Sequence, residues 1–236
     1  MPLNKAKGRM FQSVGWTWNP ITGCTHGCPY CWAKSLADRW GKPFHPQFRE
    51  HFLKDQMPND GTWIFVGSTG DIMCDGMKDE WVLKIIQFIY ENKSDNKFLL
   101  ITKDTIGFLA FGLELEKIKD KVILGTTIET NRETGWSTAP LSTKRAEQLA
   151  LMKDNGFTTF LSLEPLADFD VDKLTYMIIA IDPEAIEIGL ENYTEFLPKP
   201  PEDKILELLD NIEGMGIPYM LKENLRHLGE TANDTK

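Results

Sequence analysis

The sequence predicts an α/β fold in which parallel strands alternate with helices and curl into a partial or nearly closed (β/α) barrel. Short apolar runs typical of buried strands recur along the chain, and stretches with a helical spacing of apolar residues lie between them. Such alternation with short connections favours a parallel sheet that is covered by helices. No Gly-x-Gly-x-x-Gly segment follows a strand, so a dinucleotide-binding sheet of the Rossmann kind has little support.

The predicted strands are runs dominated by Val, Ile, Leu and aromatic residues, at Val14–Trp18, Thr62–Val66, Phe98–Ile101, Val122–Ile128, Phe157–Leu163, Ala185–Leu190 and Ile217–Leu221. Four of the predicted helices show an apolar stripe or a start and stop signal. These are a helix with Val82, Ile85, Ile86 and Ile89 on one face, a helix over 106–113, a helix from an N-cap at Ser142 to about Asn155, and a helix over Asp203–Glu213.

The length of 236 residues fits one barrel domain over residues 1–236. Residues 42–61 contain three prolines, which predicts a long loop insert between the first helix and the second strand. The polar residues from about 229 onward predict a flexible tail.

The formal net charge of −9 argues against general nucleic-acid binding, because affinity for a phosphate backbone comes from Lys and Arg. It leaves room for a nucleic-acid substrate that meets a local basic patch. No secretory apolar region opens the sequence, and no apolar run approaches the ~20 residues of a membrane span. The sequence therefore predicts a cytoplasmic protein that does not bind membranes.

Nearly every predicted strand is followed by an ionisable residue, and the spacing of these residues matches the length of one strand–helix unit. They are Asp71, Lys103, Glu129, Glu164, Glu191 and Lys222. In barrels of parallel strands the active site assembles at the carboxyl ends of the strands, so this series predicts a polar pocket there. The alternative is that each residue is simply a solvated charge where a strand meets water.

Three cysteines lie within eight residues, in the pattern Cys24-x3-Cys28-x2-Cys31. Three thiolates complete neither a four-thiolate iron–sulfur site nor a closed zinc site, and a cubane cluster held by three cysteines keeps one iron open. Gly23 and Gly27 supply the backbone freedom that such a loop needs. A zinc site completed by His26 or His45 is the alternative.

The fourth cysteine, Cys74, stands apart from this motif near the exit of the second predicted strand. We expect it to be an inert, partly buried residue. With one spare cysteine, the sequence offers no basis for a second cluster.

The motif, with the aromatic Tyr30 before its last cysteine and a strand before its first, resembles the signature of the radical S-adenosylmethionine superfamily. The resemblance implies a partial barrel of that superfamily's type. It also implies a [4Fe–4S] cluster whose open iron is chelated by S-adenosylmethionine. Reductive cleavage of that cofactor would give methionine and a 5′-deoxyadenosyl radical, which abstracts hydrogen from a substrate.

A finer resemblance runs from about residue 14 to 225 and is to a phage-associated, three-cysteine branch of unknown function. The segments that carry it are Trp18–Cys24, Gly70–Met73, Leu100–Lys103, Ser162–Leu166 and Tyr219–Lys222. These segments are specific for the branch and imply no chemistry of their own.

The resemblance implies that Cys24, Cys28 and Cys31 ligate the cluster and that Tyr30 lies against the adenine of the cofactor. Where the superfamily has a Gly-Gly-Glu segment, this chain reads Val-Gly-Ser-Thr-Gly-Asp, so its acidic residue is shifted. The residues expected at the methionine and ribose groups are Gly67, Ser68, Thr69, Asp71, Glu129 and Asn131.

The remaining strand-end charges are expected to serve the substrate. Glu164, Glu191 and Lys222 would grip it or move a proton, and Lys103 would neutralise an anionic group. By analogy, the substrate is nucleotide-like or another small molecule, and an external donor such as flavodoxin or ferredoxin supplies the electron. The alternatives are a metal- or cluster-stabilised binding protein without radical chemistry and a radical enzyme that modifies a peptide.

Overall fold

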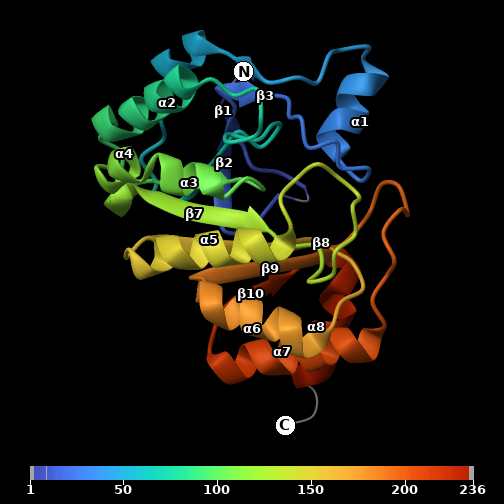
Figure 1. Cartoon of the computed structure of the whole chain (residues 1–236). Helices are drawn as coiled ribbons and strands as arrows, with labels where there is room; N and C mark the ends of the chain where they lie inside the picture. The colour runs from blue at the N-terminus through green and yellow to red at the C-terminus, as the bar shows by residue number, and fades with distance from the viewer. Residues whose placement is uncertain (1–2, 9, 234–236) are drawn as a thin grey trace.

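The computed structural model describes residues 3–8 and 10–233 and shows a curled eight-stranded sheet in the order β1-β2-β5-β6-β7-β8-β9-β10 (Figure 1). Seven of these strands are parallel: β2 (Val14–Trp18), β5 (Trp63–Val66), β6 (Lys97–Ile101), β7 (Val122–Thr127), β8 (Thr158–Leu166), β9 (Ala185–Leu190) and β10 (Tyr219–Leu221). The short strand β1 (Leu3–Lys5) adds antiparallel to the edge at β2. The predicted partial parallel barrel is confirmed.

The barrel is open, since β1 and β10 are the two edges of the sheet. Side chains and loops of the N-terminal segment bridge the opening. Gln12 Nε2 donates to the carbonyl of Leu221 at 3.2 Å, and the backbone N–H of Ser13 donates to Glu187 at 3.3 Å. The ring of Phe11 lies inside the curl, with its centroid 5.5 Å from that of Phe65 and 5.2 Å from that of Phe160. The N-terminal segment therefore fills the concave side of the sheet.

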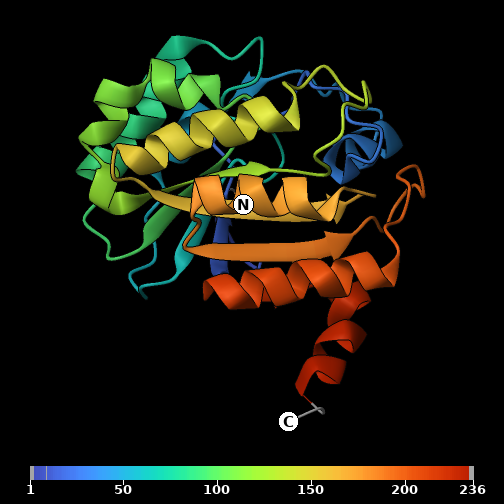
Figure 2. The same ribbon diagram turned by 60° about the horizontal axis from the view of Figure 1, so that its bottom comes forward.

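The helices are α1 (Trp32–Arg39), α2 (Asp79–Glu91), α3 (Ile106–Ala110), α4 (Gly112–Glu116), α5 (Ser142–Asp154), α6 (Val171–Ile181), α7 (Glu202–Met215) and α8 (Arg226–Asn233). Helices α2 to α7 cover the convex side of the sheet, whereas α1 lies beside the ends of the strands and α8 extends away from the sheet (Figure 2). The apolar stripe predicted for α2 is confirmed, because all four of its residues are buried in the layer between the helices and the sheet. Helix α6 lies between α5 and α7 and had no counterpart in the sequence analysis.

Two details of the helices differ from the prediction. The helix expected over 106–113 is broken at Phe111 into α3 and α4. Gly107 and Gly112 flank this break, and glycine is a poor helix former. Ser142 is the first residue of α5 and not its N-cap, which is Leu141. The hydroxyl of Ser142 instead accepts a hydrogen bond from Arg145, one turn further along the same helix, at 2.9 Å.

The predicted insert at 42–61 carries structure of its own. It contains β4 (Gln47–Phe48), which pairs antiparallel with β3 (Ile21–Thr22), and a 3-10 helix over Glu50–Lys54. Further 3-10 turns lie at Lys119–Lys121 and Glu223–Leu225. Residues 229–233, expected in a flexible tail, belong to α8. Within the described residues, no helix has the length and apolar character to cross a membrane.

Candidate active site at the carboxyl ends of the strands

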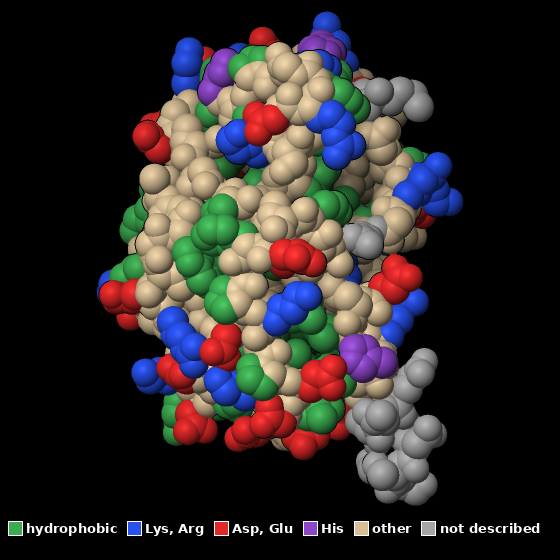
Figure 3. All heavy atoms as spheres, turned by 90° about the vertical axis from the view of Figure 1, so that its right-hand side faces the viewer, with side chains coloured by type: hydrophobic (Ala, Val, Ile, Leu, Met, Phe, Trp, Pro, Cys, Tyr) green, Lys and Arg blue, Asp and Glu red, His purple; other side chains and the backbone are tan. Residues whose placement is uncertain are grey.

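A cavity of about 380 Å³ opens where the parallel strands end. Figure 3 views the molecule from the side toward which the strands point, where apolar side chains gather near the middle of the face. The cavity is lined on one side by all three clustered cysteines and on the other by residues of the later strand ends. The strand-end residues at its wall include Asp71, Lys103, Glu164 and Glu191.

The segment 23–31, here called the cysteine loop, is anchored to the exit of β5. Gly23 donates from its backbone to Thr69 at 3.0 Å, and its carbonyl accepts from the N–H of Asp71 at 3.3 Å. Gly23 has a φ of 85°, and a Cβ there would lie 2.0 Å from the carbonyl oxygen of His45. Only glycine fits this position, because any side chain would collide with the backbone of the insert.

Each cysteine sulfur of the loop has an N–H group beside it. Cys24 Sγ accepts from the backbone N–H of His26 at 3.4 Å, and Cys31 Sγ accepts from that of Lys34, also at 3.4 Å, as the N-cap of α1. Cys28 Sγ lies 3.5 Å from Nζ of Lys103. Donors of this kind stabilise thiolates, so the loop provides three sulfurs suited to bind metal.

The three cysteine sulfurs do not converge on one point in this structure. Two thiolates on one zinc ion, with bonds of about 2.3 Å, lie no more than ~4.6 Å apart. Among the described residues, the group of ligand atoms gathered within 4.8 Å of one another is Cys24, His26 and Asp71, and it includes neither Cys28 nor Cys31. A single ion fits Cys24, His26 and Asp71 as they lie, whereas a group that uses all three cysteines would have to span a larger distance.

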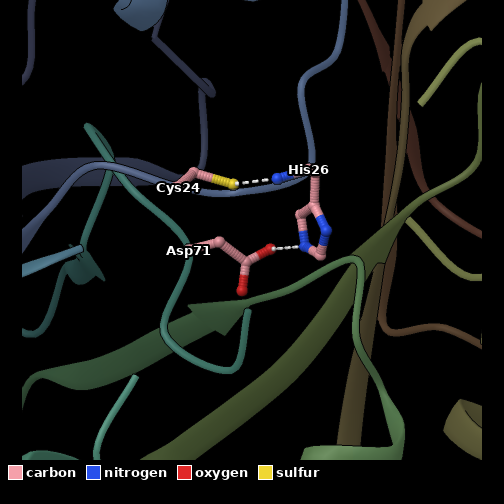
Figure 4. Close-up of side chains that lie close together, drawn as sticks. All are labelled: Cys24, His26 and Asp71. Carbon is pink, nitrogen blue, oxygen red and sulfur yellow. Dashed lines mark hydrogen bonds and ion pairs between the residues drawn. The ribbon is translucent and has the colours of Figure 1, made fainter. Parts of the chain in front are cut away.

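His26, within the cysteine loop, contacts Asp71, which follows β5 (Figure 4). His26 Nε2 lies 3.1 Å from Asp71 Oδ2, and both side chains are buried. Asp71 also accepts from Thr102 Oγ1 at 2.6 Å and from the backbone N–H of Lys103 at 2.9 Å. Burial would raise the pKa of Asp71, but these hydrogen bonds outweigh it and lower the pKa. The carboxylate acts as an anchor between the loop and two strand ends.

Cys74 is buried near the exit of β5, where the sequence placed it, but it is not isolated. Its thiol donates to the carbonyl of Asp71 at 3.4 Å and forms a hydrogen bond with Cys24. That hydrogen bond lowers the pKa of Cys74 and, together with burial, raises the pKa of Cys24. The expectation of a lone cysteine is corrected, because the turn after β5 folds back under the loop.

Lys103, Glu129, Arg145 and Tyr30 form a buried network, here called the Lys103 network. Glu129 pairs with Lys103 Nζ through one oxygen and with Arg145 through the other, each at 2.7 Å. The Tyr30 hydroxyl donates to Glu129 and accepts from Lys103 Nζ at 2.8 Å. Burial would raise the pKa of Glu129, but the two cations hold it well below its usual range.

Arg145 was missed by the sequence analysis. A signal did exist, because Arg145 belongs to the inward stripe of α5 with Ala146, Leu149 and Met152, where a charge needs a buried partner. Its guanidinium also donates to the carbonyl of Thr127, which ties α5 to the end of β7.

A second buried network, here called the Lys222 network, lies on the concave side of β8 to β10. Lys222 Nζ is 2.8 Å from Glu187 and 3.4 Å from Glu164, and it lies over the ring of Phe11 at 4.7 Å from the centroid. A second cavity of about 280 Å³ reaches Lys222 and shares Glu164 and Asn192 with the first. Glu187 was also missed, although a single carboxylate within an otherwise apolar strand could have indicated it.

Two other predicted residues, Glu191 and Asn131, form hydrogen bonds with neighbouring loops. Glu191 lines the first cavity, but its carboxylate accepts from Thr194 and from the backbone N–H of Leu197 at 3.0 Å. Burial would raise the pKa of Glu191, yet these bonds lower it. Asn131 accepts from the N–H of Asp170 at 2.8 Å and is absent from the residues that line the first cavity. Both residues shape loops at the rim.

Of the predicted glycine-rich segment after β5, Ser68 lines the first cavity and Gly67 and Thr69 do not. The hydroxyls of Ser68 and Thr69 both donate to Asn19 Oδ1, at 3.0 and 3.3 Å. Gly67 lies against the side chain of Ile21. The segment is thus held to the turn that precedes the cysteine loop.

Fold and site together define an α/β half-barrel protein with a three-cysteine loop at the strand ends. The chain belongs to the family described as "Protein of unknown function (DUF5131)", which it matches over residues 11–222. No curated protein matches it in sequence.

Two solved structures of spore photoproduct lyase have a similar fold, each at 14% sequence identity. The lyase complexed with dinucleoside spore photoproduct matches with a TM-score of 0.61 over 92% of this chain and 78% of the other. A mutant lyase with bound AdoMet and dinucleoside spore photoproduct matches with a TM-score of 0.60 over 91% of this chain and 78% of the other. At this identity the likeness establishes the shared fold.

Proposed function

We propose that this protein is a radical S-adenosylmethionine enzyme that acts on a nucleotide-like or other small substrate. One observation carries the proposal: three thiols of one loop, each beside an N–H donor, border a single cavity at the strand ends. When bound, a [4Fe–4S] cluster and S-adenosylmethionine would supply a 5′-deoxyadenosyl radical for hydrogen abstraction.

On the cofactor side, Cys24, Cys28 and Cys31 hold the cluster. Tyr30 and Ser68, which border the same cavity, orient S-adenosylmethionine, and Gly67 and Thr69 act by holding the backbone at Ser68 in place. The presence of AdoMet in a spore photoproduct lyase of similar fold supports this arrangement. Asp71 anchors the loop, and Glu129 and Asn131 act behind the first layer of contacts, since both already have protein partners.

On the substrate side, the cavity wall is apolar at Phe11, Phe65 and Ile101 and polar at Glu164 and Glu191. A primary carbon radical reacts with almost any nearby C–H bond, so selectivity requires a confined and oriented substrate. Lys222 contributes through the adjoining cavity. The dinucleoside in the lyase structures supports a nucleotide-like substrate.

The wider setting is part of the same proposal. We place the enzyme in the cytoplasm and in a phage-associated branch of the superfamily. An external one-electron donor such as flavodoxin or ferredoxin supplies the electron.

The test is anaerobic reconstitution with iron and sulfide, followed by reduction in the presence of S-adenosylmethionine. We expect a brown protein with about four irons per chain that releases 5′-deoxyadenosine. Cys28→Ala removes one ligand and should abolish both signals while far-ultraviolet circular dichroism stays unchanged. Cys74→Ala is the matched control, because it removes a buried thiol that contacts Cys24 but is not a proposed ligand, and it should retain iron.

A binding protein without radical chemistry is the second candidate, favoured by the close approach of Cys24, His26 and Asp71. A colourless protein that holds one zinc ion and makes no 5′-deoxyadenosine would support it. Iron and turnover retained in Cys28→Ala would refute the assignment of Cys28 as a cluster ligand.

A further inference from the structure

Lys103 is the cation nearest to a sulfur of the cysteine loop, and its side chain is only 14% exposed. The backbone N–H of Lys103 is fixed by Asp71, and its Nζ is fixed by Glu129 and by the Tyr30 hydroxyl. The ammonium also lies 4.7 Å from the centroid of the Tyr30 ring. The lysine is therefore held in one place against Cys28.

The ammonium remains charged. Its Nζ lies 2.7 Å from the buried carboxylate of Glu129, and an opposite charge at this distance favours the charged form of the lysine. Glu129 does not neutralise Lys103 completely, because its second oxygen is paired with Arg145. Two cations share one carboxylate, so the Lys103 network carries a formal charge of +1 beside Cys28, while the carboxylate of Asp71 lies next to His26 in the same loop.

We propose that Lys103 raises the reduction potential of the cluster held by the cysteine loop and does not bind substrate. This inference rests on the proposed function. Reduction takes one electron from the external donor and adds one unit of negative charge to a centre that three thiolates already make anionic. A buried cation at the Cys28 ligand stabilises that added charge, and the low dielectric of the interior keeps the effect strong.

The test is a potentiometric titration of the anaerobically reconstituted protein, followed by electron paramagnetic resonance of the reduced cluster. Lys103→Met removes the charge and keeps the length of the side chain. We expect its equilibrium constant for one-electron reduction to fall at least tenfold, which corresponds to a shift of about 59 mV to more negative potential.

Two further variants decide whether charge is the cause. Lys103→Arg keeps the cation and should stay near the wild-type potential. Glu129→Gln removes the anion and should shift the potential in the opposite direction. Lys121→Met is the matched control, since Lys121 bonds backbone carbonyls of residues 89 to 92 at the far end of the barrel, and it should leave the potential unchanged.

The outcomes separate this inference from the proposed function. If the wild-type protein takes up no cluster, both fail. If the wild type holds a cluster and cleaves S-adenosylmethionine, an unchanged potential in Lys103→Met overturns the role of Lys103 alone. If Lys103→Met loses its cluster, Lys103→Arg and Glu129→Gln decide. The role of Lys103 is overturned if the potential of Lys103→Arg lies far from that of the wild type. It is also overturned if the potential of Glu129→Gln does not shift to more positive values.

Discussion

Two buried lysines stand at strand ends beside two adjoining cavities, and the networks that they form carry opposite formal charge. Lys103 shares the carboxylate of Glu129 with a second cation, Arg145. Lys222 lies between two carboxylates, Glu164 and Glu187. Two cations against one anion suit a neighbour that is itself anionic, as three thiolates are. One cation against two anions suits a neutral or cationic part of a ligand.

The comparison teaches that the type of a strand-end residue does not determine its role. Both lysines follow strands in the same barrel, at corresponding places in the repeat. The partners that neighbouring elements bring to each lysine set the local charge. The following predictions test this difference, in order of decreasing expected effect.

Arg145→Met should cause the largest loss of stability. The change leaves the buried Glu129 with one cation and leaves the carbonyl of Thr127 without its donor, so we expect the free energy of unfolding to fall by about 3–5 kcal/mol. Urea denaturation measures it. Arg132→Met is the control, because Arg132 is 40% exposed and its ion pairs with Asp168 and Asp170 should each contribute only about 0–1 kcal/mol. Equal losses in the two variants would contradict a buried network.

Glu187→Gln, in the Lys222 network, should lower the free energy of unfolding by less than Arg145→Met does. Lys222 keeps Glu164 as a partner, and the amide can still accept a hydrogen bond, so we expect a loss of about 1–3 kcal/mol in urea denaturation. The reduction potential of the cluster should not change. A shift in potential as large as that of Lys103→Met would show that the two networks are not electrically distinct.

The Lys103 network should also account for more of the loss of stability at acidic pH than the Lys222 network. The pKa of Glu129 is lower in the folded chain than its ordinary value of 4.5, so its contribution is complete above that pH and is lost as the pH falls toward the folded value. One such carboxyl changes stability by up to about 1.4 kcal/mol per pH unit. Urea midpoints between pH 7 and pH 3 measure the effect, and a slope that Glu129→Gln fails to reduce would count against it.

Glu164→Gln should have the smallest effect on folding. Its side chain is 20% exposed and 3.4 Å from Lys222, so a loss below about 1 kcal/mol is expected. Reductive cleavage of S-adenosylmethionine in the absence of substrate should continue at the wild-type rate, measured as 5′-deoxyadenosine by chromatography. If cleavage is lost instead, Glu164 belongs to the cofactor side.

The amino-acid sequence by itself determined the repeating strand–helix order, the position of the cysteine motif after the first strand, and the charged residues at the strand ends. These features are local, because an apolar run, a cysteine spacing and a residue that follows a strand can all be recognised within a short window. The same reasoning overlooked α6 and joined α3 to α4, where propensity is ambiguous without the packing around it.

Only the tertiary structure decided which charges meet. Arg145 reaches Glu129 from a helix, Glu187 reaches Lys222 from the middle of a neighbouring strand, and Cys74 returns beneath Cys24 from a separate turn. These contacts depend on the curl of the sheet and on how each helix is rotated against it. Electrostatic effects in a low-dielectric interior depend on distances of a few ångströms, and the linear order of residues does not contain those distances.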